Sequence, residues 1–408
     1  MLWLIWCVLL CRVELGASLS SVIANETALD LENEVFGLQD GVSSRQARYF
    51  PFYTIGRIAN IPCTASNGLA GTCLIRGECA ESGGLFGGNC STFTNQATCC
   101  IFSKTCGGST NLNSTYFTNR GYPGGFNDGG SCSFTISPCS SAVCQLRIDF
   151  RTLTLAQPNA DGECLTDVMT VTGGSSEVPP ICGENSGQHV YVNFDELNPI
   201  TIKIATSGGT SFSRLWNLQL QQINCDSRLR APDGCLQYHL GTTGIISSFN
   251  YGTAANAAVS TTGLVGTRQL ANHRYGICIR SGPDKCTITY SVPSNGGRYA
   301  FTVSGDASVL DPLLIGDPLL LMNGEMCTEM DYVIIPAPSI TLPNIVGFIP
   351  PFDVNFPQDR FCGLGWWPVT STVKPFVFYV VWNENDLPDA ANRGFRLEYT
   401  QNDCSVAG

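Results

Sequence analysis

The chain has 408 residues, with 22 Lys and Arg against 33 Asp and Glu, which gives a formal net charge of −11. This charge excludes a protein that binds nucleic acid or an anionic membrane surface, because both need a basic stripe and no Lys- or Arg-rich run occurs. The 21 cysteines indicate an oxidising compartment and a disulfide framework. At about 100–200 residues per domain, the length predicts roughly two to four domains.

The N-terminus begins with the apolar run MLWLIWCVLLC, which has the length of a signal-peptide core and is too short to span a bilayer. Small residues follow at Gly16, Ala17 and Ser18, so we expect residues 1–18 to be a signal peptide and the protein to be secreted; a signal anchor is the alternative. Elsewhere the apolar stretches are interrupted by Asp or Pro, and no transmembrane anchor is expected. Loss of the signal peptide would remove 2 of the 21 cysteines and leave 19, an odd number.

Residues 19–62 lack cysteine and form an acidic N-terminal segment, a candidate pro-region. Apolar residues spaced by three or four between Ala28 and Leu38 predict one short amphipathic helix. Arg45 and Arg48 form an R-x-x-R tetrapeptide, the minimum that a subtilisin-like processing protease needs. The alternative is an ordinary exposed linker.

Residues 63–105 form a cysteine-dense block with almost no apolar run, so three disulfides are needed to fold it. A zinc site is disfavoured because the block has no His and no C-x2-C spacing. Adjacent cysteines rarely bond to each other, so the final CC pair must reach two different partners. The pattern GTCLIRGECAESGG…C…CC resembles the clip domain of arthropod extracellular protease zymogens. That resemblance implies the disulfides Cys63–Cys99, Cys73–Cys90 and Cys79–Cys100.

After Cys106 the sequence alternates between apolar and polar residues, with Gly, Pro and Asn turns between the runs. This period of two is typical of half-buried strands, and the short separations predict an antiparallel β-sandwich. The runs are QLRIDFRTLTL, DVMTVTG, HVYVNF, ITIKIATSG and LWNLQLQQI.

The motif order CGG…GYP…CSFTI…CLTD…ICG in this region resembles the CUB domain, a jelly-roll-like β-sandwich of extracellular proteins. The resemblance implies the disulfides Cys106–Cys132 and Cys164–Cys182. Cys139 and Cys144 are additional to the pattern, and we expect them to bond to each other.

A second, diverged copy begins at Cys235, where YGICIR stands for CSFTI, CTEMD for CLTD and FCG for ICG. We therefore expect two CUB-like domains, residues 106–225 and 235–404, joined by a linker at 226–234. The second copy implies Cys235–Cys278 and Cys327–Cys362. With the clip-like block, the arrangement resembles secreted insect CUB-domain proteins, a likeness carried by RAPDGCLQYHLGTTGIISSFNY and LANHRYGICIR.

Three cysteines remain after these pairings: Cys225, Cys286 and Cys404. We expect one disulfide among them, joining Cys225 to Cys404 or to Cys286 and locking the two domains together. The last thiol would be free or would link two chains, which predicts a disulfide-linked homodimer.

A catalytic function is not expected. A trypsin-like domain needs a His-containing segment, a buried Asp and GDSGGP, and none occurs. The only histidines are His189, His239 and His273, and each is expected at the surface or at a strand edge. A catalytic pair of carboxylates, as in a glycoside hydrolase, remains an alternative, because the two residues can be far apart in the sequence and come together only in the folded protein.

Calcium is the one candidate cofactor. In calcium-binding CUB domains, acids from three loops converge on the ion, which prefers hard oxygen ligands. In the first copy only Asp167 matches, since Ala156 and the stretch Ser207–Ser211 stand where the other acids are expected. In the second copy the candidate ligands are Asp331, Asp386 and Asp389, and the alternative is that Asp331 caps a turn beside a solvated acidic loop.

Three N-x-S/T sequons, at Asn25, Asn89 and Asn113, are candidate glycosylation sites. Trp366 and Trp367 are candidate recognition anchors if they are exposed, or core residues if they are not. The proline-rich apolar stretch 333–356 is a second candidate contact surface.

The sequence thus favours a secreted, non-catalytic protein that recognises an extracellular protein or a glycan. The alternatives are a regulator of an extracellular clip-protease cascade and, disfavoured by the missing triad, a hydrolase with an unrecognised site.

Overall fold

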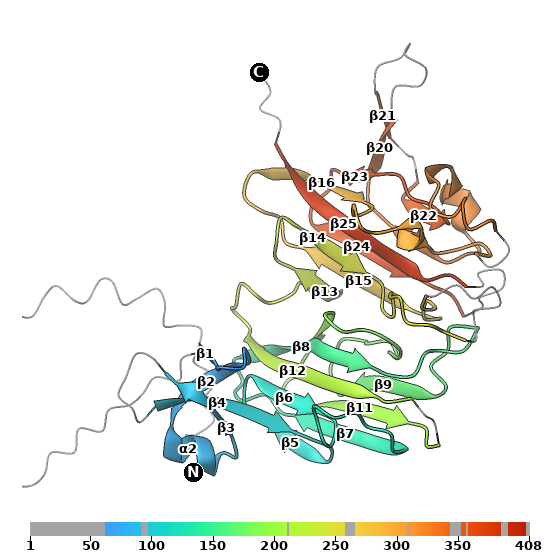
Figure 1. The fold of residues 1–408 in the computed structure, drawn as a ribbon. Coiled ribbons are helices and arrows are strands. Elements are labelled where there is room, and N and C mark those ends of the chain that lie inside the picture. Colours follow the sequence, from blue (N-terminus) through green and yellow to red (C-terminus); the bar gives the residue numbers. More distant parts are fainter. Residues whose placement is uncertain are drawn as a thin grey trace, which may run out of the picture. The chain divides into compact units, whose positions relative to one another are not determined.

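The computed structural model describes residues 62–90, 97–209, 212–257, 266–307, 310–342, 352–355, 358–384 and 391–404. The chain divides into two compact units, Met1–Ile101 and Phe102–Gly408, and the ribbon is drawn in Figure 1. The expected signal peptide, the acidic segment up to residue 61 and Asn25 lie outside the described residues. Among the described residues, no helix is long and apolar enough to cross a membrane.

The first unit is a small antiparallel sheet in which β4 pairs with both β2 and β3, and β2 pairs with β1. Three disulfides cross it: Cys63–Cys99, Cys73–Cys90 and Cys79–Cys100. They are the pairings that the clip resemblance implies, and Cys79, Cys99 and Cys100 are buried. Its elements are β1 (Pro62–Thr64), β2 (Ala70–Ile75), α2 (Arg76–Glu81), β3 (Leu85–Asn89) and β4 (Ala97–Lys104).

The second unit contains two β-sandwiches. In the first sandwich, one sheet has the order β6-β12-β8-β10 and the other has the order β5-β7-β11-β9. The end of β4, Phe102–Lys104, runs parallel to β6. The strands are β5 (Gly108–Thr110), β6 (Thr115–Thr118), β7 (Gly130–Ile136), β8 (Val143–Thr154), β9 (Asp167–Thr172), β10 (His189–Asn193), β11 (Ile200–Thr206) and β12 (Leu215–Asn224).

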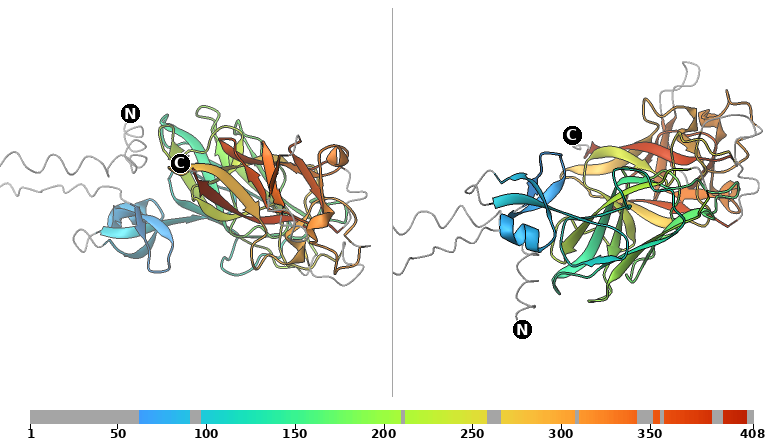
Figure 2. Two further views of the ribbon diagram at one scale, coloured as in Figure 1. Left: turned by 90° about the horizontal axis from the view of Figure 1, so that it is seen from above. Right: turned by 60° about the horizontal axis from the view of Figure 1, so that its bottom comes forward.

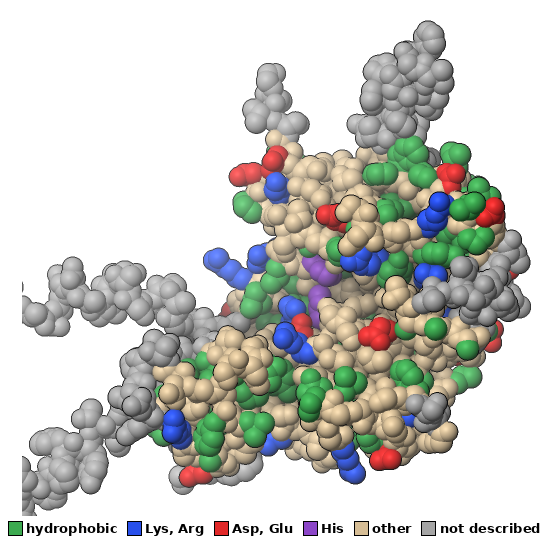
Figure 3. Space-filling model, viewed as in Figure 1, with side chains coloured by type: hydrophobic (Ala, Val, Ile, Leu, Met, Phe, Trp, Pro, Cys, Tyr) green, Lys and Arg blue, Asp and Glu red, His purple; other side chains and the backbone are tan. Residues whose placement is uncertain are grey.

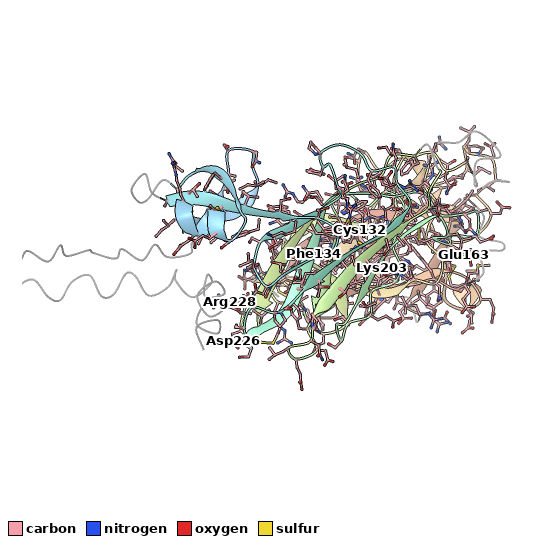
Figure 4. The ribbon with its side chains drawn as sticks, turned by 90° about the horizontal axis from the view of Figure 1, so that it is seen from below. Cys132, Phe134, Glu163, Lys203, Asp226 and Arg228 are labelled. Atoms are coloured by element: carbon pink, nitrogen blue, oxygen red, sulfur yellow. A yellow bond between two sulfur atoms is a disulfide. The ribbon has the colours of Figure 1, made fainter. Side chains whose placement is uncertain are left out.

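The core of the first sandwich is built by the predicted alternation of side chains. Phe134 on β7 is fully buried and stacks on Phe117, with ring centroids 5.0 Å apart. Lys203, on the neighbouring strand β11, is exposed, and Figure 4 labels both Phe134 and Lys203. The predicted antiparallel sandwich is confirmed, because inward apolar side chains of both sheets meet in one core.

The second sandwich repeats this architecture. One sheet contains β13-β15-β24-β19-β22-β18 and the other β14-β25-β16-β23-β20-β21, so both first-sandwich sheet orders recur in it. Figure 2 shows the strands of both sandwiches from two further directions. The strands are β13 (Cys235–His239), β14 (Thr243–Ser247), β15 (Arg274–Ile279), β16 (Lys285–Ser291), β17 (Phe301–Thr302), β18 (Leu321–Asn323), β19 (Tyr332–Ile334), β20 (Pro338–Leu342), β21 (Phe352–Asn355), β22 (Arg360–Gly363), β23 (Val369–Ser371), β24 (Phe376–Val381) and β25 (Gly394–Asp403).

Within the described part of the second sandwich, three short 3-10 helices lie in the longer connections. They are η2 (Arg298–Ala300), η3 (Pro318–Leu320) and η4 (Gly324–Cys327).

The disulfides of the sandwiches agree with the resemblance at four positions. These are Cys106–Cys132, Cys164–Cys182, Cys235–Cys278 and Cys327–Cys362.

The expected Cys139–Cys144 disulfide is wrong. Cys144 lies on β8 and bonds to Cys225, which follows β12, because Val143 and Asn224 are register partners and hold the two Cα atoms 4.8 Å apart. Cys139, which is also disulfide-bonded, therefore does not pair with Cys144.

The expected link from Cys225 to Cys286 or Cys404 is also wrong. Cys286 bonds to Cys404 inside the second sandwich, again over 4.8 Å, because β16 and β25 pair with Lys285 opposite Asp403. Cys225, Cys286 and Cys404 are thus all bonded within one chain. The expected disulfide-linked homodimer, which needed a free thiol among these three, loses its basis.

Candidate functional site

In the first sandwich, Asp167, the one residue that matches a calcium ligand, is paired with the guanidinium of Arg214. Asp167 opens β9, and its carboxylate accepts two hydrogen bonds from the guanidinium of Arg214, each of 2.8 Å. Both side chains are fully buried. The backbone N–H groups of Ala156 and Ser207 donate to the same carboxylate. Ala156 and Ser207 stand where the resemblance implies further acids, and they instead donate hydrogen bonds to the carboxylate of Asp167.

This arrangement does not fit a calcium ion. Calcium needs several free oxygen ligands, whereas both oxygens of Asp167 already accept hydrogen bonds, two of them from a positive charge. The guanidinium of Arg214 also donates to the carbonyl of Ser207, which ties the two loops together. In the first sandwich Arg214 thus provides the loop ordering and the charge compensation that an ion would provide.

The second sandwich places Asp331 at the equivalent position, directly before β19. Asp331 is fully buried and accepts hydrogen bonds from Gln269 Nε2, at 2.5 Å, and from the backbone N–H of Asn383, at 2.8 Å. These contacts tie β19 to the end of β24, as the turn-capping alternative requires. Asp386 and Asp389 lie outside the described residues, so calcium at these three acids stays a prediction.

The tandem tryptophans are not an exposed anchor. Trp366 is only 3% exposed, donates its Nε1–H to the carbonyl of Tyr290 and packs on Phe301, with ring centroids 4.5 Å apart. Trp367 is half-buried. For Trp366 the core alternative therefore holds, because the large ring fills the space between the two sheets of the second sandwich.

The proline-rich stretch 333–356 is described only in part, since residues 343–351 and 356 fall outside the described ranges. Its described strands, β20 and β21, form an antiparallel pair. Ile340 on β20 is buried, so this apolar side chain belongs to the core.

Among the described residues, the most exposed large apolar side chains of the second sandwich lie instead in residues 311–326. We call Leu313, Leu314, Leu319 and Met326 the leucine surface. Their exposed fractions are 70%, 48%, 85% and 57%.

The backbone beneath the leucine surface is fixed by a short repeat, DPLL at 311–314 and again at 317–320. In both copies the Asp side chain accepts a hydrogen bond of 2.9 Å from the backbone N–H two residues later. Between the copies, Ile315 is 1% exposed. Gly316 follows with φ of +87°, and a Cβ there would lie 2.5 Å from the carbonyl oxygen of Arg298. The leucines are therefore displayed by a turn that is anchored on both sides.

The chain segment that carries the leucine surface is acidic, and within the described residues a basic contact to it comes from Arg298, which donates to the carbonyl of Leu313. Between Arg298 and Arg360 the sequence contains no Lys, Arg or His. Figure 3 shows hydrophobic, acidic and basic side chains intermixed over the second sandwich. The exposed or half-buried acids of this segment are Asp311, Asp317, Glu325 and Glu329.

The three histidines lie where the two sandwiches meet, which corrects the expectation of surface positions. His189 and His273 are 8% and 1% exposed, and His239 is half-buried. Histidine side chains are visible between the two sandwiches in Figure 3. Among the described residues, each histidine contacts aromatic rings or backbone groups.

Burial keeps these imidazoles neutral. Burial lowers the pKa of His273 to about 4. Burial, with a smaller contribution from the charge on Arg147, lowers the pKa of His239 to about 4. The pKa of His189 is lowered well below its usual value by burial, then by His239 and Arg147.

The two described sequons differ in environment. Asn89 is exposed, and its Oδ1 accepts a hydrogen bond from Arg76. Asn113 is half-buried, and its amide makes hydrogen bonds to the backbone of Gln222 on β12.

One group of cysteine sulfurs has the spacing of a metal cluster. The sulfurs of Cys63, Cys73 and Cys90 lie within 4.8 Å of one another. All three belong to disulfides and offer no thiolate, so they do not form a zinc site.

Two protein-family models match the chain. The one described as "CUB domain" matches residues 106–214, and the one described as "Animal CUB domain" matches residues 232–402. No curated protein matches the chain at a significant level.

Several solved structures are similar to it. The CUB1-EGF-CUB2 domains of rat MASP-1 are 11% identical with a TM-score of 0.25, over 73% of this chain and 99% of that one. The MASP-1 CUB2 domain bound to Ca2+ is 20% identical with a TM-score of 0.25, over 28% of this chain and 98% of that one. The full extracellular region of zebrafish Gpr126/Adgrg6 is 11% identical with a TM-score of 0.25, over 75% of this chain and 34% of that one.

Proposed function

Because the chain contains two CUB domains, which are typically extracellular interaction modules, we propose that it is a non-catalytic binding protein that holds a partner protein on the leucine surface of its second domain. The observation that carries the proposal is the anchored double turn from which Leu313 and Leu319 project, at 70% and 85% exposure.

Exposed leucines on a rigid turn favour recognition over chance exposure. Burying one leucine side chain against a partner contributes about 1.5–3 kcal/mol. The Asp311 and Asp317 side chains fix the two turns before binding, so little further ordering is needed when a partner arrives.

The charge of the surface indicates the chemistry of the partner. Four acids and no base lie in the segment between residues 311 and 329. A partner with an apolar pocket edged by Lys or Arg would be attracted and oriented by this charge. A sulfated or otherwise acidic glycan would be repelled, so a protein is favoured over an anionic glycan.

The test compares the full-length protein with Leu313→Ser/Leu319→Ser as bait in native extracellular fluid. Leu165→Ser/Leu197→Ser in the first domain is the matched control, because these leucines are 71% and 62% exposed. We expect a basic protein to be retained by the parent and by the control, and lost from the Leu313/Leu319 variant and in high salt. Equal retention by all three baits would contradict the proposal.

A second candidate function, a regulator of a clip-protease cascade, is favoured by one observation in the disulfide-rich unit. Leu85 and Phe86 are adjacent on β3 and are 61% and 60% exposed. Among described strands, β3 pairs only with β4, and on its other side the carbonyl of Gly87 accepts a hydrogen bond from the backbone N–H of Ser66. We expect Leu85→Ser/Phe86→Ser, in the full chain, to lose any bound protease while binding at the leucine surface is kept. Unchanged recovery of the protease would contradict the cascade role.

We also propose that the protein is secreted. We infer that residues 1–18 direct export, because nine disulfides within the described residues need an oxidising compartment. N-terminal sequencing of protein from the medium tests this and also shows whether the chain is cleaved after Arg48.

A further inference from the structure

All three histidines of the chain take part in the contact between the two CUB domains. We propose that this junction is an acid-sensitive latch, closed while the three imidazoles are neutral and opened when they take up protons. The proposal goes beyond the binding function, since it concerns how the two domains are held.

His189 is the link from the first domain to β13. Its Nε2 lies 3.0 Å from the backbone nitrogen of Tyr238, which donates to it in the tautomer that leaves Nε2 unprotonated. The other tautomer would donate to the carbonyl of Tyr238 at 3.1 Å. Only a neutral ring can accept the Tyr238 N–H, so protonation removes that bond.

His239 packs directly on His189 from the second domain. The two ring centroids are 5.1 Å apart, and the ring of Tyr399 lies 5.9 Å from His239 on another side. Among the described residues, the buried Nε2 of His239 has no hydrogen-bond partner. Charging both rings would place two cations in contact, one of them with a buried, unsatisfied nitrogen.

His273 forms the same kind of link at a separate place. Its Nε2 donates to the carbonyl of Pro180 in the first domain, at 2.9 Å. That bond puts the proton of the neutral ring on Nε2. The other nitrogen, Nδ1, is buried without a partner among the described residues, so a second proton would enter a site with no acceptor.

The charged and titratable groups around the histidines do not offset these charges. On β8, Asp149 is paired with Arg147, whose Nε lies 2.9 Å from both carboxylate oxygens. Arg147 also donates to the hydroxyl of Tyr191 on β10. The remaining facing groups are Arg280 after β15 and the neutral phenols Tyr238, Tyr275 and Tyr399. Glu177, Asp233, Arg230 and Arg274 line the cleft at the edge of the junction. The charges that act on the buried rings of His189 and His239 are positive.

The junction also has contacts that involve no titratable group. It contains hydrogen bonds between uncharged groups, such as Asn250 N to Asn185 Oδ1 at 2.7 Å and Ala271 N to Gly162 O at 3.0 Å. Each of the nine disulfides described above lies within one domain or within the clip-like block, so opening of the junction leaves every domain cross-linked. A cleft of about 600 Å³ between Tyr191 of the first domain and Tyr275 of the second brings solvent to its edge.

The direction and size of the effect follow from the lowered pKa values. Burial lowers the pKa of His239 and His273 from 6.5 to about 4, so neutral rings favour the closed junction. Closure is fully favoured above pH 6.5 and weakens as the pH falls from there towards 4. Each histidine contributes up to about tenfold per pH unit in this window, and three together up to about 1000-fold.

Hydrogen exchange of the full-length protein between pH 7.5 and 4.5 tests the latch. After correction for the intrinsic pH dependence of exchange, the amides of Asn250 and Ala271 should lose up to about 1000-fold in protection per pH unit below about 6.5. Amides of the central strands β11 and β24 should keep theirs. Protection should return when the pH is restored.

Two variants isolate the histidines. His239→Phe keeps the aromatic packing, and His273→Gln keeps a donor for Pro180. We expect the loss of protection at the Asn250 and Ala271 amides to fall to at most about 100-fold per pH unit in His239→Phe. In the double variant His239→Phe/His273→Gln it should fall to at most about tenfold per pH unit. Retained junction protection at pH 4.5, loss that coincides with the core amides, or an unchanged slope in the variants would each overturn the latch.

Discussion

Arg214 and Asp167 form a fully buried ion pair inside the first CUB domain, with two nitrogens of the guanidinium each 2.8 Å from a carboxylate oxygen. The two residues are 47 positions apart and join the loop before β12 to the start of β9. An internal cation thus occupies the place where a calcium site would otherwise form.

Removal of one partner should destabilise the domain strongly. Arg214→Ala leaves the carboxylate of Asp167 buried without a counter-charge, and we expect the free energy of unfolding to fall by about 3–5 kcal/mol. The matched control is Arg230→Ala, whose partner Asp233 lies 3.8 Å away and is 80% exposed. There we expect less than about 1 kcal/mol. Urea denaturation measures both, and equal losses would contradict the structural role of the buried pair.

Calcium in the second domain can be tested separately. If Asp331, Asp386 and Asp389 bind the ion, calcium at about 100 times its Kd stabilises the fold by about 2.7 kcal/mol and raises Tm. Asp386→Asn/Asp389→Asn should abolish the shift, while Asp161→Asn, an exposed acid of the first domain, should leave it intact. A Tm that is the same in calcium and in EDTA would remove the site.

Each sandwich should depend for its stability on the disulfide that joins its last cysteine to an inner strand, Cys144–Cys225 in the first and Cys286–Cys404 in the second. Cys286 and Cys404 are 118 positions apart, so Cys286→Ser/Cys404→Ser frees a long loop in the unfolded chain. We expect a loss of about 2–5 kcal/mol. Peptide mapping without reduction should recover Cys144 joined to Cys225, and Cys286 joined to Cys404. A Cys139–Cys144 peptide would refute the assignment.

The two described sequons should respond differently to substitution. Asn89 is exposed, so Asn89→Gln should remove one glycan mass and change stability by less than about 0.5 kcal/mol. Asn113 holds β12 through hydrogen bonds to Gln222 at 2.8 and 3.3 Å. Asn113→Gln should cost about 1–2 kcal/mol whether or not a glycan is attached. Mass spectrometry before and after deglycosylation, with thermal melting, separates the two effects.

The repeat in the sequence contains enough information to predict the disulfides Cys144–Cys225 and Cys286–Cys404. Cys286 is the repeat equivalent of Cys144, and Cys404 and Cys225 both end their domains. Matching pairs within each copy therefore follow from the repeat alone. Proximity in the chain favours Cys139 with Cys144 instead, whereas strand register brings Cys144 beside Cys225.

The sequence by itself determined the β-sandwich class, the duplication and most disulfides, because period-two alternation and cysteine order are written locally and repeated along the chain. Only the tertiary structure decided which surfaces face each other. It buried Trp366 between two sheets, paired Asp167 with Arg214, displayed Leu313 and Leu319, and brought three scattered histidines to one junction. Such contacts join residues far apart in the chain, and no local pattern specifies which partners the folded sheets bring together.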